Sequence, residues 1–437
     1  MLKLRSYITN ILMLVVMASG MTACSSHDLD SINSDKNIFI IYSIGYNNLS
    51  SYLSNDIREV VKNFRPQLTN DILIIYSHPT RSYDDYITPN SPTLTQIRRN
   101  EKGRMQTDTL AIYPDNTNSA SAQTLHDVLN LVKETHPGAN YGILFSSHST
   151  GWVPDGYCND PGKYDKAADN SFDWALRRKA ATVPGPTWGV QLPGGGPVLK
   201  SFGTQFYKSG GSTLMHEIDI TDMAQAFPMK MDYIIFDSCF MGGIEVAYEF
   251  RNVCRYMIFS QTEILADGMD YGRLTSHVFL RNRTAMRQIC QDYYNQYAKK
   301  TGVDRSATIS LVDCSKLEDL ACICREIFES QREEIAANED SRTIQQYFRP
   351  SNRDYHRWFY DLESIVRYSG TEADLLLPFY EALDRCVLFK MATEKFLLEL
   401  DIKEHCGLSM YLPFAEYDYL NSFYKTLEWN KATGLVQ

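Results

Sequence analysis

The chain has 437 residues, of which 44% are hydrophobic, and its 53 acidic against 43 basic residues give a formal net charge of −10. This length and composition are enough for one large hydrophobic core or two smaller ones. Because binding to phosphate groups needs a basic face, the acidic balance excludes a typical nucleic-acid-binding protein. The same balance is compatible with a cationic peptide as substrate.

The N-terminus predicts export from the cell. Met1–Arg5 is basic, and the apolar stretch Ile8–Met17 that follows is too short for a comfortable membrane span. This pattern is typical of a signal peptide, which we place at residues 1–23.

Cys24 directly follows Ala23 in a pattern that resembles a lipoprotein signal-peptidase site. We therefore expect Cys24 to become the acylated N-terminus, with several acyl chains as a stable anchor. The alternative is an ordinary signal peptide that is cleaved near Ala23. Ser25 resembles the sorting signal for the outer membrane, and residues 24–36 are a polar tether. We expect a lipid anchor in the bacterial outer membrane, on its periplasmic face or at the cell surface.

Strand and helix patterns alternate over the next hundred residues. Short apolar runs predict strands at 37–44, 71–76, 109–113 and 141–147, and amphipathic patterns predict helices that end near 64 and at 135. This alternation predicts an α/β fold with a mostly parallel sheet sandwiched by helices.

Two of the predicted buried strands end in chemically reactive residues. His148 follows residues 141–147, and Cys239 follows residues 233–237, just before a helical pattern at 244–250. A cysteine at a helix N-terminus favours the thiolate, although a single cysteine is also a common core residue. If the two strands are parallel neighbours, His148 and Cys239 meet at the carboxyl edge of the sheet, where open α/β sheets carry their sites.

These two motifs resemble the clostripain family of cysteine endopeptidases, which has a caspase-like fold. The family's His-Gly-x-Gly-Trp is similar to residues 148–152, and its Asp-x-Cys-x-Met is similar to residues 237–241. Residues 407–413 resemble a late Gly-Leu-Ser-x-Tyr-x-Pro strand of the family. Ser149 stands where the family usually has Gly.

The resemblance implies that Cys239 is the nucleophile and His148 its acid–base partner. The thiolate would attack the substrate carbonyl, and His148 would protonate the leaving amine. The backbone N–H groups of Cys239 and Ser149 would stabilise the oxyanion, since serine keeps the N–H of the glycine that it replaces.

In the family, the aspartate two residues before the cysteine belongs to the primary specificity pocket. By strand alternation, Asp237 and Cys239 project to one side, so Asp237 could hold an Arg or Lys side chain of the substrate. The alternative is a capping carboxylate for the following helix. Asp267 and Asp270 are candidates for a second acid, and Trp152 for packing or for the pocket wall.

Residues 153–215, between the two reactive strands, are rich in Gly, Pro and charge. A long irregular insert at the active-site edge could be a lid or a processed linker. It contains the basic cluster Arg177, Arg178 and Lys179. This cluster is either a site of autoprocessing by an enzyme that cuts after basic residues or a solvated charge run.

The second half of the chain continues with both element types. We expect helices at 218–227, 285–300, 316–337, 361–368 and 375–400, and strands at 256–260 and 308–312. We divide the chain into a caspase-like catalytic domain, 37–300, and a largely helical C-terminal subdomain, 301–437.

We therefore expect a monomeric cysteine endopeptidase that cleaves proteins or peptides after Arg or Lys through a thioester acyl-enzyme. One alternative is a catalytically silent surface lipoprotein that binds basic peptides on the same fold. The other is an active peptidase of different primary specificity. We expect no cofactor; clostripain responds to calcium, but the sequence shows no compact calcium loop, and metal dependence stays open.

Overall fold

The computed structural model describes residues 36–45, 49–66, 70–79, 91–159, 161–165, 205–209, 212–337, 343–349, 358–415 and 417–437. All of them belong to one compact unit, Asp35–Gln437. The predicted signal peptide, Cys24 and the basic cluster at 177–179 lie outside these described residues. Within them, no helix has the length and apolar character that a membrane span requires.

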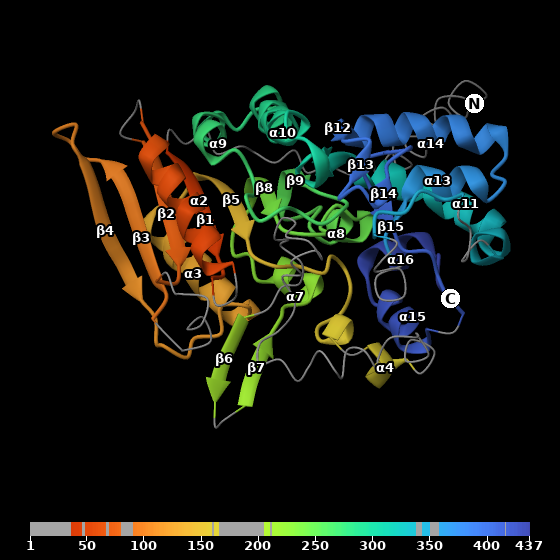
Figure 1. The fold of residues 1–437 in the computed structure, drawn as a ribbon, viewed down its shortest axis with the longest axis horizontal. Helices are drawn as coiled ribbons and strands as arrows, with labels where there is room; N and C mark the ends of the chain where they lie inside the picture. Colours follow the sequence, from red (N-terminus) through yellow and green to blue (C-terminus); the bar gives the residue numbers. More distant parts are fainter. Residues whose placement is uncertain are drawn as a thin grey trace, which may run out of the picture. The chain divides into compact units, whose positions relative to one another are not determined.

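A nine-stranded sheet forms the centre of this unit, with the strand order β12-β10-β9-β8-β5-β1-β2-β3-β4 (Figure 1). The five central strands pair in parallel, whereas the strands at both ends join in antiparallel pairings. The bounds are β1 (Asn37–Ser43), β2 (Asp71–Ser77), β3 (Thr93–Arg99), β4 (Met105–Ile112), β5 (Asn140–Ser146), β8 (Met231–Asp237), β9 (Cys254–Phe259), β10 (Thr308–Asp313) and β12 (Val387–Ala392).

Helices cover both faces of the sheet, because successive strand residues point into two different hydrophobic layers. In β1, Ile38 and Ile40 pack into one layer, and Phe39 and Ile41 into the other. The first layer includes α3 (Ala122–Thr135), α7 (Ile220–Gln225), α8 (Ile244–Glu249) and α11 (Leu317–Ala337), and the second α2 (Ser50–Asn63), α9 (Tyr271–His277) and α10 (Arg283–Ala298). This architecture confirms the predicted fold class.

The C-terminal region is largely helical, but it also completes the central sheet. β10 and β12 pair with each other, and β10 pairs with β9, so the sheet continues across the division expected at residue 300. The other elements are α13 (Leu362–Tyr368), α14 (Ala373–Cys386), α15 (Asp418–Tyr424), α16 (Glu428–Thr433) and the small pairs β11 (Tyr360–Asp361) with β15 (Ser409–Met410) and β13 (Lys395–Phe396) with β14 (Leu400–Asp401).

The hairpin β3–β4 corrects one prediction, because the sequence indicated only a single strand at 109–113. β3 is mostly polar, and only Leu94 and Ile97 are buried apolar residues in it. The turn carries a local signal that sequence reasoning missed. The side chain of Asn100 accepts from the N–H of Arg104 at 3.0 Å, and Gly103 has a φ of 72°.

One further boundary was also wrong. The helix expected at 375–400 ends at Cys386, because the apolar run Val387–Ala392 pairs with β10 as an edge strand. Such short runs fit a helix or a strand equally well, and tertiary pairing decides.

The insert at 153–215 is not irregular throughout. It contains α4 (Pro161–Tyr164) and a hairpin of β6 (Gln205–Ser209) with β7 (Ser212–His216).

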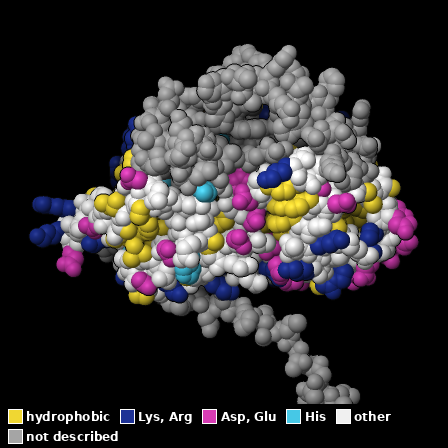
Figure 2. Space-filling view, turned by 90° about the horizontal axis from the view of Figure 1, so that it is seen from below, with side chains coloured by type: hydrophobic (Ala, Val, Ile, Leu, Met, Phe, Trp, Pro, Cys, Tyr) yellow, Lys and Arg dark blue, Asp and Glu magenta, His cyan; other side chains and the backbone are white. Residues whose placement is uncertain are grey.

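The surface carries charges of both signs. Among the described residues on the face drawn in Figure 2, acidic side chains lie beside Lys and Arg side chains, and these residues form no broad field of one sign. Ion pairs contribute to this mixture, such as Arg251 with Glu318 at 2.7 Å. The described residues of this face therefore form no extended basic surface of the kind that phosphate binding requires.

The C-terminal segment is hydrogen bonded to the helix that follows Cys239. Glu245, in the first turn of α8, is fully buried. It accepts from the N–H of Tyr411 at 2.7 Å and from the hydroxyl of Tyr424 at 2.8 Å. Burial raises the pKa of Glu245 from 4.5 to about 7, although these two hydrogen bonds oppose the shift.

A substitution at Gly142 tests the contact between β5 and β8. A Cβ on Gly142 would lie 1.9 Å from Cζ of the buried Tyr233 ring. We expect Gly142→Ala to lower the free energy of unfolding by about 1–3 kcal/mol, because the ring must move in a packed core. Gly272→Ala in α9 is the control, since its nearest neighbour, Nδ2 of Asn63, is 3.5 Å away. Urea denaturation of both variants measures the difference; equal stabilities would contradict the proposed clash.

Glu245 should make the protein less stable as the pH rises from 4.5 to about 7. The folded state keeps the proton up to the higher pKa and the unfolded state releases it at the lower one, so the folded state binds more protons in this window. Glu245→Gln should flatten this part of the plot of unfolding free energy against pH. Glu326→Gln, on the exposed side of α11, is the control and should keep the slope of the unmodified protein. An unchanged slope in Glu245→Gln would exclude this role.

Candidate active site

The two reactive motifs emerge at one edge of the sheet, because β5 and β8 are parallel neighbours. Their last paired residues are Ser146 and Asp237. His148 and Cys239 each follow two residues later, at the carboxyl edge. Both residues are buried, and Cys239 has an exposed fraction of 0%.

A hydrogen bond and a close backbone contact hold together the loops that carry His148 and Cys239. The hydroxyl of Ser149 donates a hydrogen bond to the carbonyl of Cys239. Gly151 has a φ of 62°, and a Cβ there would lie 2.5 Å from the carbonyl oxygen of Phe240. The histidine loop therefore needs glycine at this position both for its backbone conformation and for the close approach.

Phe240, directly after Cys239, holds an unusual backbone conformation. Its φ is 58°, which is uncommon for a bulky residue. Its N–H donates to the carbonyl of Thr262 at 3.0 Å, and its ring stacks on Phe359 with a centroid distance of 4.6 Å. Strained backbone of this kind persists only when its surroundings fix it.

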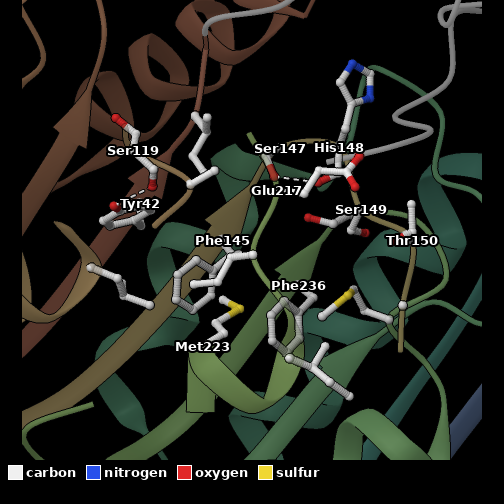
Figure 3. A pocket seen from close by; sticks show the side chains of 18 residues that line it. Tyr42, Ser119, Phe145, Ser147, His148, Ser149, Thr150, Glu217, Met223 and Phe236 are labelled. Atoms are coloured by element: carbon white, nitrogen blue, oxygen red, sulfur yellow. Dashed lines mark hydrogen bonds between the residues drawn. The ribbon is translucent and has the colours of Figure 1, made fainter. Parts of the chain in front are cut away.

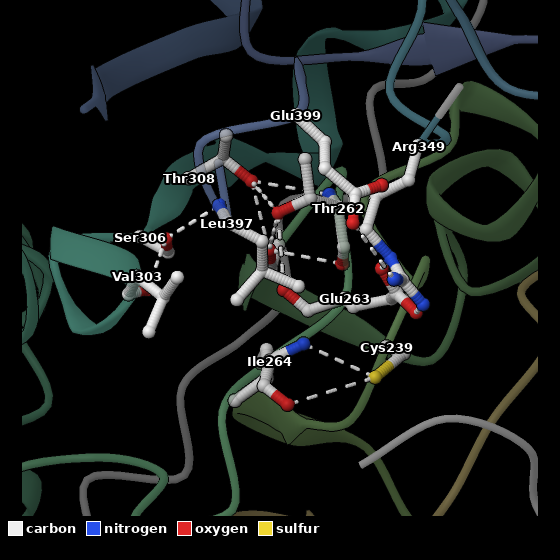
Figure 4. A network of polar contacts seen from close by, with 11 residues as sticks. Cys239, Thr262, Glu263, Ile264, Val303, Ser306, Thr308, Arg349, Leu397 and Glu399 are labelled. Carbon is white, nitrogen blue, oxygen red and sulfur yellow. Dashed lines mark hydrogen bonds and ion pairs between the residues drawn. The ribbon is translucent and has the colours of Figure 1, made fainter. Parts of the chain in front are cut away.

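The thiol of Cys239 contacts the backbone of Ile264 (Figure 4). Sγ accepts from the Ile264 N–H at 3.1 Å and lies 3.9 Å from the carbonyl oxygen of the same residue. An N–H group stabilises a thiolate and a carbonyl accepts from a thiol, so this contact can accommodate both protonation states.

A buried ion pair lies close to this thiol. Arg349 donates to both carboxylate oxygens of Glu263, at 2.8 and 3.1 Å, and the two side chains are 5% and 3% exposed (Figure 4). Burial alone would lower the pKa of Arg349, but Glu263, Glu399 and Cys239 together raise it above its ordinary value. The guanidinium therefore remains charged within electrostatic range of the thiol, where a cation favours the thiolate.

Asp237 lies at the end of β8 and is fully buried. It accepts hydrogen bonds from the Ser146 hydroxyl at 3.1 Å and from the Tyr271 hydroxyl. Burial and then the charge of Asp237 raise the pKa of Tyr271 and of Tyr293, and Cys239 adds to the shift at Tyr293. Asp237 and Cys239 therefore both lie within electrostatic range of the Tyr293 hydroxyl.

The capping role that the sequence left open for Asp237 does not apply. Helix α8 begins at Ile244, and its N-cap residue is Gly243. β8 also ends at Asp237, so strand alternation alone does not set the direction of the Cys239 side chain.

The candidates for a second acid are engaged elsewhere. Asp267 has a side chain that is 61% exposed and pairs with Lys300 at 2.9 Å. Asp270 is the N-cap of α9, where it accepts from the N–H of Arg273 at 3.0 Å. Sequence reasoning missed Asp56 of α2, which is 8% exposed.

Asp56 shares its surroundings with Asp237. Burial is the main cause of the raised pKa of Tyr271, and both Asp237 and Asp56 add to it. No motif marks Asp56 in the sequence, because only the packing of α2 against α9 brings it to this place.

Trp152 is 1% exposed and packs against Tyr411 and Tyr424, with ring centroids 4.8 and 5.0 Å away. Of the two roles that the sequence left open, this position favours packing over the wall of a substrate pocket.

An apolar cavity of about 80 Å³ lies beside His148 (Figure 3). Phe145, Met223 and Phe236 line this histidine-side cavity, together with the loop residues 147–151. In the described part of the chain, no group of three or more His, Cys, Asp or Glu side chains could hold a metal ion.

Known proteins resemble this chain in sequence and in fold. The model of the clostripain family matches residues 41–173 and 210–432, which is most of the chain. No curated protein sequence matches it. An inactive zymogen of a C11 protease from Parabacteroides distasonis is 27% identical, with a TM-score of 0.68, over 91% of this chain and 97% of that one.

A secreted C11 cysteine protease from Bacteroides thetaiotaomicron, solved with an irreversible peptide inhibitor, has the same fold. It is 21% identical, with a TM-score of 0.67, over 91% of this chain and 99% of that one. The family match and the shared fold lead to one conclusion: this chain belongs to the clostripain family and is a cysteine protease.

Proposed function

We propose that the protein is an endopeptidase that cleaves peptide bonds after Arg or Lys, with Cys239 as nucleophile and His148 as its partner. The observation that carries this proposal is the register of β5 and β8. It sends both residues to one sheet edge and leaves the buried Asp237 at the last paired position.

The thiolate of Cys239 attacks the carbonyl carbon of the substrate, and the carbonyl oxygen becomes an oxyanion. The backbone N–H groups of Cys239 and Ser149 are the proposed donors to it. The C–N bond then breaks as His148 gives its proton to the leaving amine, which leaves a thioester. Water attacks the thioester while His148 takes a proton, and the acid product and the thiolate are released.

The preference for a basic residue is supported by the acids on the α9 and α10 side of the sheet. A substrate guanidinium or ammonium group there would lose its water and would pair with a buried carboxylate, which makes the charge strongly selective. Asp237 is the main candidate, and Asp56 is better placed than Asp267 or Asp270 as a second acid.

The fully buried thiol supports a latent precursor. We propose that maturation includes cleavage within residues 153–215, at the basic cluster Arg177, Arg178 and Lys179. A relative that is 27% identical is described as an inactive zymogen. N-terminal sequencing of active enzyme tests this proposal, and active enzyme that consists of one intact chain would exclude it.

We also propose a location for the protein. Acylation of Cys24 would anchor it in the outer membrane, where proteins or peptides with basic residues are its substrates. We further propose that it acts as a monomer and needs no cofactor. Mass spectrometry of the N-terminal peptide from a membrane fraction would detect the lipid.

Replacement of the nucleophile should abolish turnover. We expect Cys239→Ala to lose all measurable hydrolysis of Arg- and Lys-terminated fluorogenic peptides under reducing conditions. Cys322→Ala is the control, because Cys322 is exposed and its loss should leave the rate unchanged. Folded, processed protein without turnover on basic or other peptides would instead favour a silent protein that binds basic peptides.

Asp237→Asn should change the primary specificity. Asparagine still accepts from Tyr271 and Ser146 but lacks the charge, so kcat/KM for basic peptides should fall by about 100-fold or more, as after loss of one partner of a buried charge pair. Asp267→Asn is the control and should keep the preference for Arg and Lys, because this acid pairs with Lys300 at the surface. A basic preference that survives Asp237→Asn would remove Asp237 from the specificity pocket.

A further inference from the structure

The histidine-side cavity has no role in the chemistry proposed so far. Its floor is formed by Phe145, Met223 and Phe236, and Figure 3 shows these side chains across from His148 and Ser149. An apolar floor with a few polar groups at the rim is the usual composition of a site that binds part of a ligand.

Several polar side chains around the cavity already have partners. The Tyr42 hydroxyl donates to the carbonyl of Ser119 at 2.8 Å, and the Ser119 hydroxyl is 2.7 Å from that of Tyr76. Glu217 accepts from the N–H of Gly156 at 2.7 Å. The apolar floor therefore decides which side chains the cavity accepts, and it favours an aliphatic one.

Strand alternation separates this cavity from the buried acid. Phe236 lines the cavity, whereas Asp237, the next residue of β8, contacts Tyr271 on the opposite face. The same holds in β5, where Phe145 lines the cavity and Ser146 donates to Asp237. The cavity and the buried acid thus lie on opposite faces of the same strand ends.

The chemistry relates the cavity and the buried acid to opposite directions along the substrate. His148 must reach the nitrogen of the leaving amine, so the residue after the cleaved bond lies on the side of Cys239 that faces His148. The histidine loop lines the cavity, and the acid that attracts the residue before the bond lies on the other face.

We propose that the histidine-side cavity is the subsite for the side chain directly after the cleaved bond, and that it selects an aliphatic residue. This inference rests on the proposed function. An apolar cavity of about 150 Å³ holds benzene, so a cavity of about 80 Å³ fits Val or Leu but not Trp.

The test uses internally quenched peptides that are identical except after the scissile bond, with Arg before it. Gly, Val, Leu, Phe, Trp or Asp follows the bond. We expect kcat/KM for the Val and Leu peptides to exceed those for Gly, Trp and Asp by about 10-fold or more, as for other apolar pockets. Equal values across the series would overturn the subsite.

Two variants of Met223 change the size of the cavity in opposite directions. Met223→Trp fills it and should reduce the ratio of the Leu to the Gly rate constant by about 10-fold. Met223→Ala enlarges it and should move the preference toward Phe, which keeps the test valid if the tryptophan variant does not fold. Met229→Trp, on the same layer but outside the cavity lining, should keep the ratio of the unmodified enzyme.

A second series places the same residues directly before Arg. If Met223→Trp alters selectivity there and not after the bond, the cavity belongs to the acyl side and the proposal is wrong. Hydrolysis of Arg- and Lys-aminomethylcoumarin peptides tests the proposed function separately. If the coumarin peptides are hydrolysed but the quenched peptides show no preference for the residue after the bond, the subsite alone is overturned. If no peptide of either kind is hydrolysed, both the subsite and the proposed function are overturned.

Discussion

The parallel pairing of β5 with β8 is the constraint on which the site depends. It fixes the register that ends at Ser146 and Asp237, and so it sets where both reactive loops begin. A shift by one residue would exchange the faces of every side chain in one strand. Phe236 would then occupy the place of Asp237, and the separation of the acid from the apolar cavity would be lost. The fit of Tyr233 over Gly142 reinforces this register, because only glycine leaves room for the ring.

Segments distant in sequence complete the site. Phe359 packs on Phe240, Arg349 pairs with Glu263 beside the thiol, and Glu245 binds the segment that contains Tyr411. The C-terminal region therefore supports the cysteine loop from several sides. A mutation there should affect catalysis through the position of that loop, even though the mutated residue is far from the motifs in sequence.

The sequence predicted the central strands and the two motifs because those signals are local: a short apolar run, then a reactive residue and small residues. It did not predict β12, because the same run suits a helix until β10 offers a pairing edge. Asp56 and Arg349 were missed for a related reason. Each is an isolated charged residue in the sequence, and only the packing of α2 and of the segment before residue 350 brings them to the acid and to the thiol. Asp267 and Asp270 were proposed because residues 261–272 partly resemble the family, but a surface ion pair and a helix cap engage them.

The buried acid and the apolar cavity, which lie on opposite faces of the strand ends, should contribute unequally to substrate specificity. A site built around a buried carboxylate discriminates strongly, because a substrate without the matching charge leaves a buried charge without compensation. An apolar cavity discriminates by about 10–200-fold for each missing group, since only transfer energy is lost. Under the proposed function, the residue before the cleaved bond should decide whether a site is cut, and the residue after it should rank the sites that qualify. The opposite order would require a charge on the cavity side, and Glu217, the carboxylate in that lining, already accepts from the backbone of Gly156.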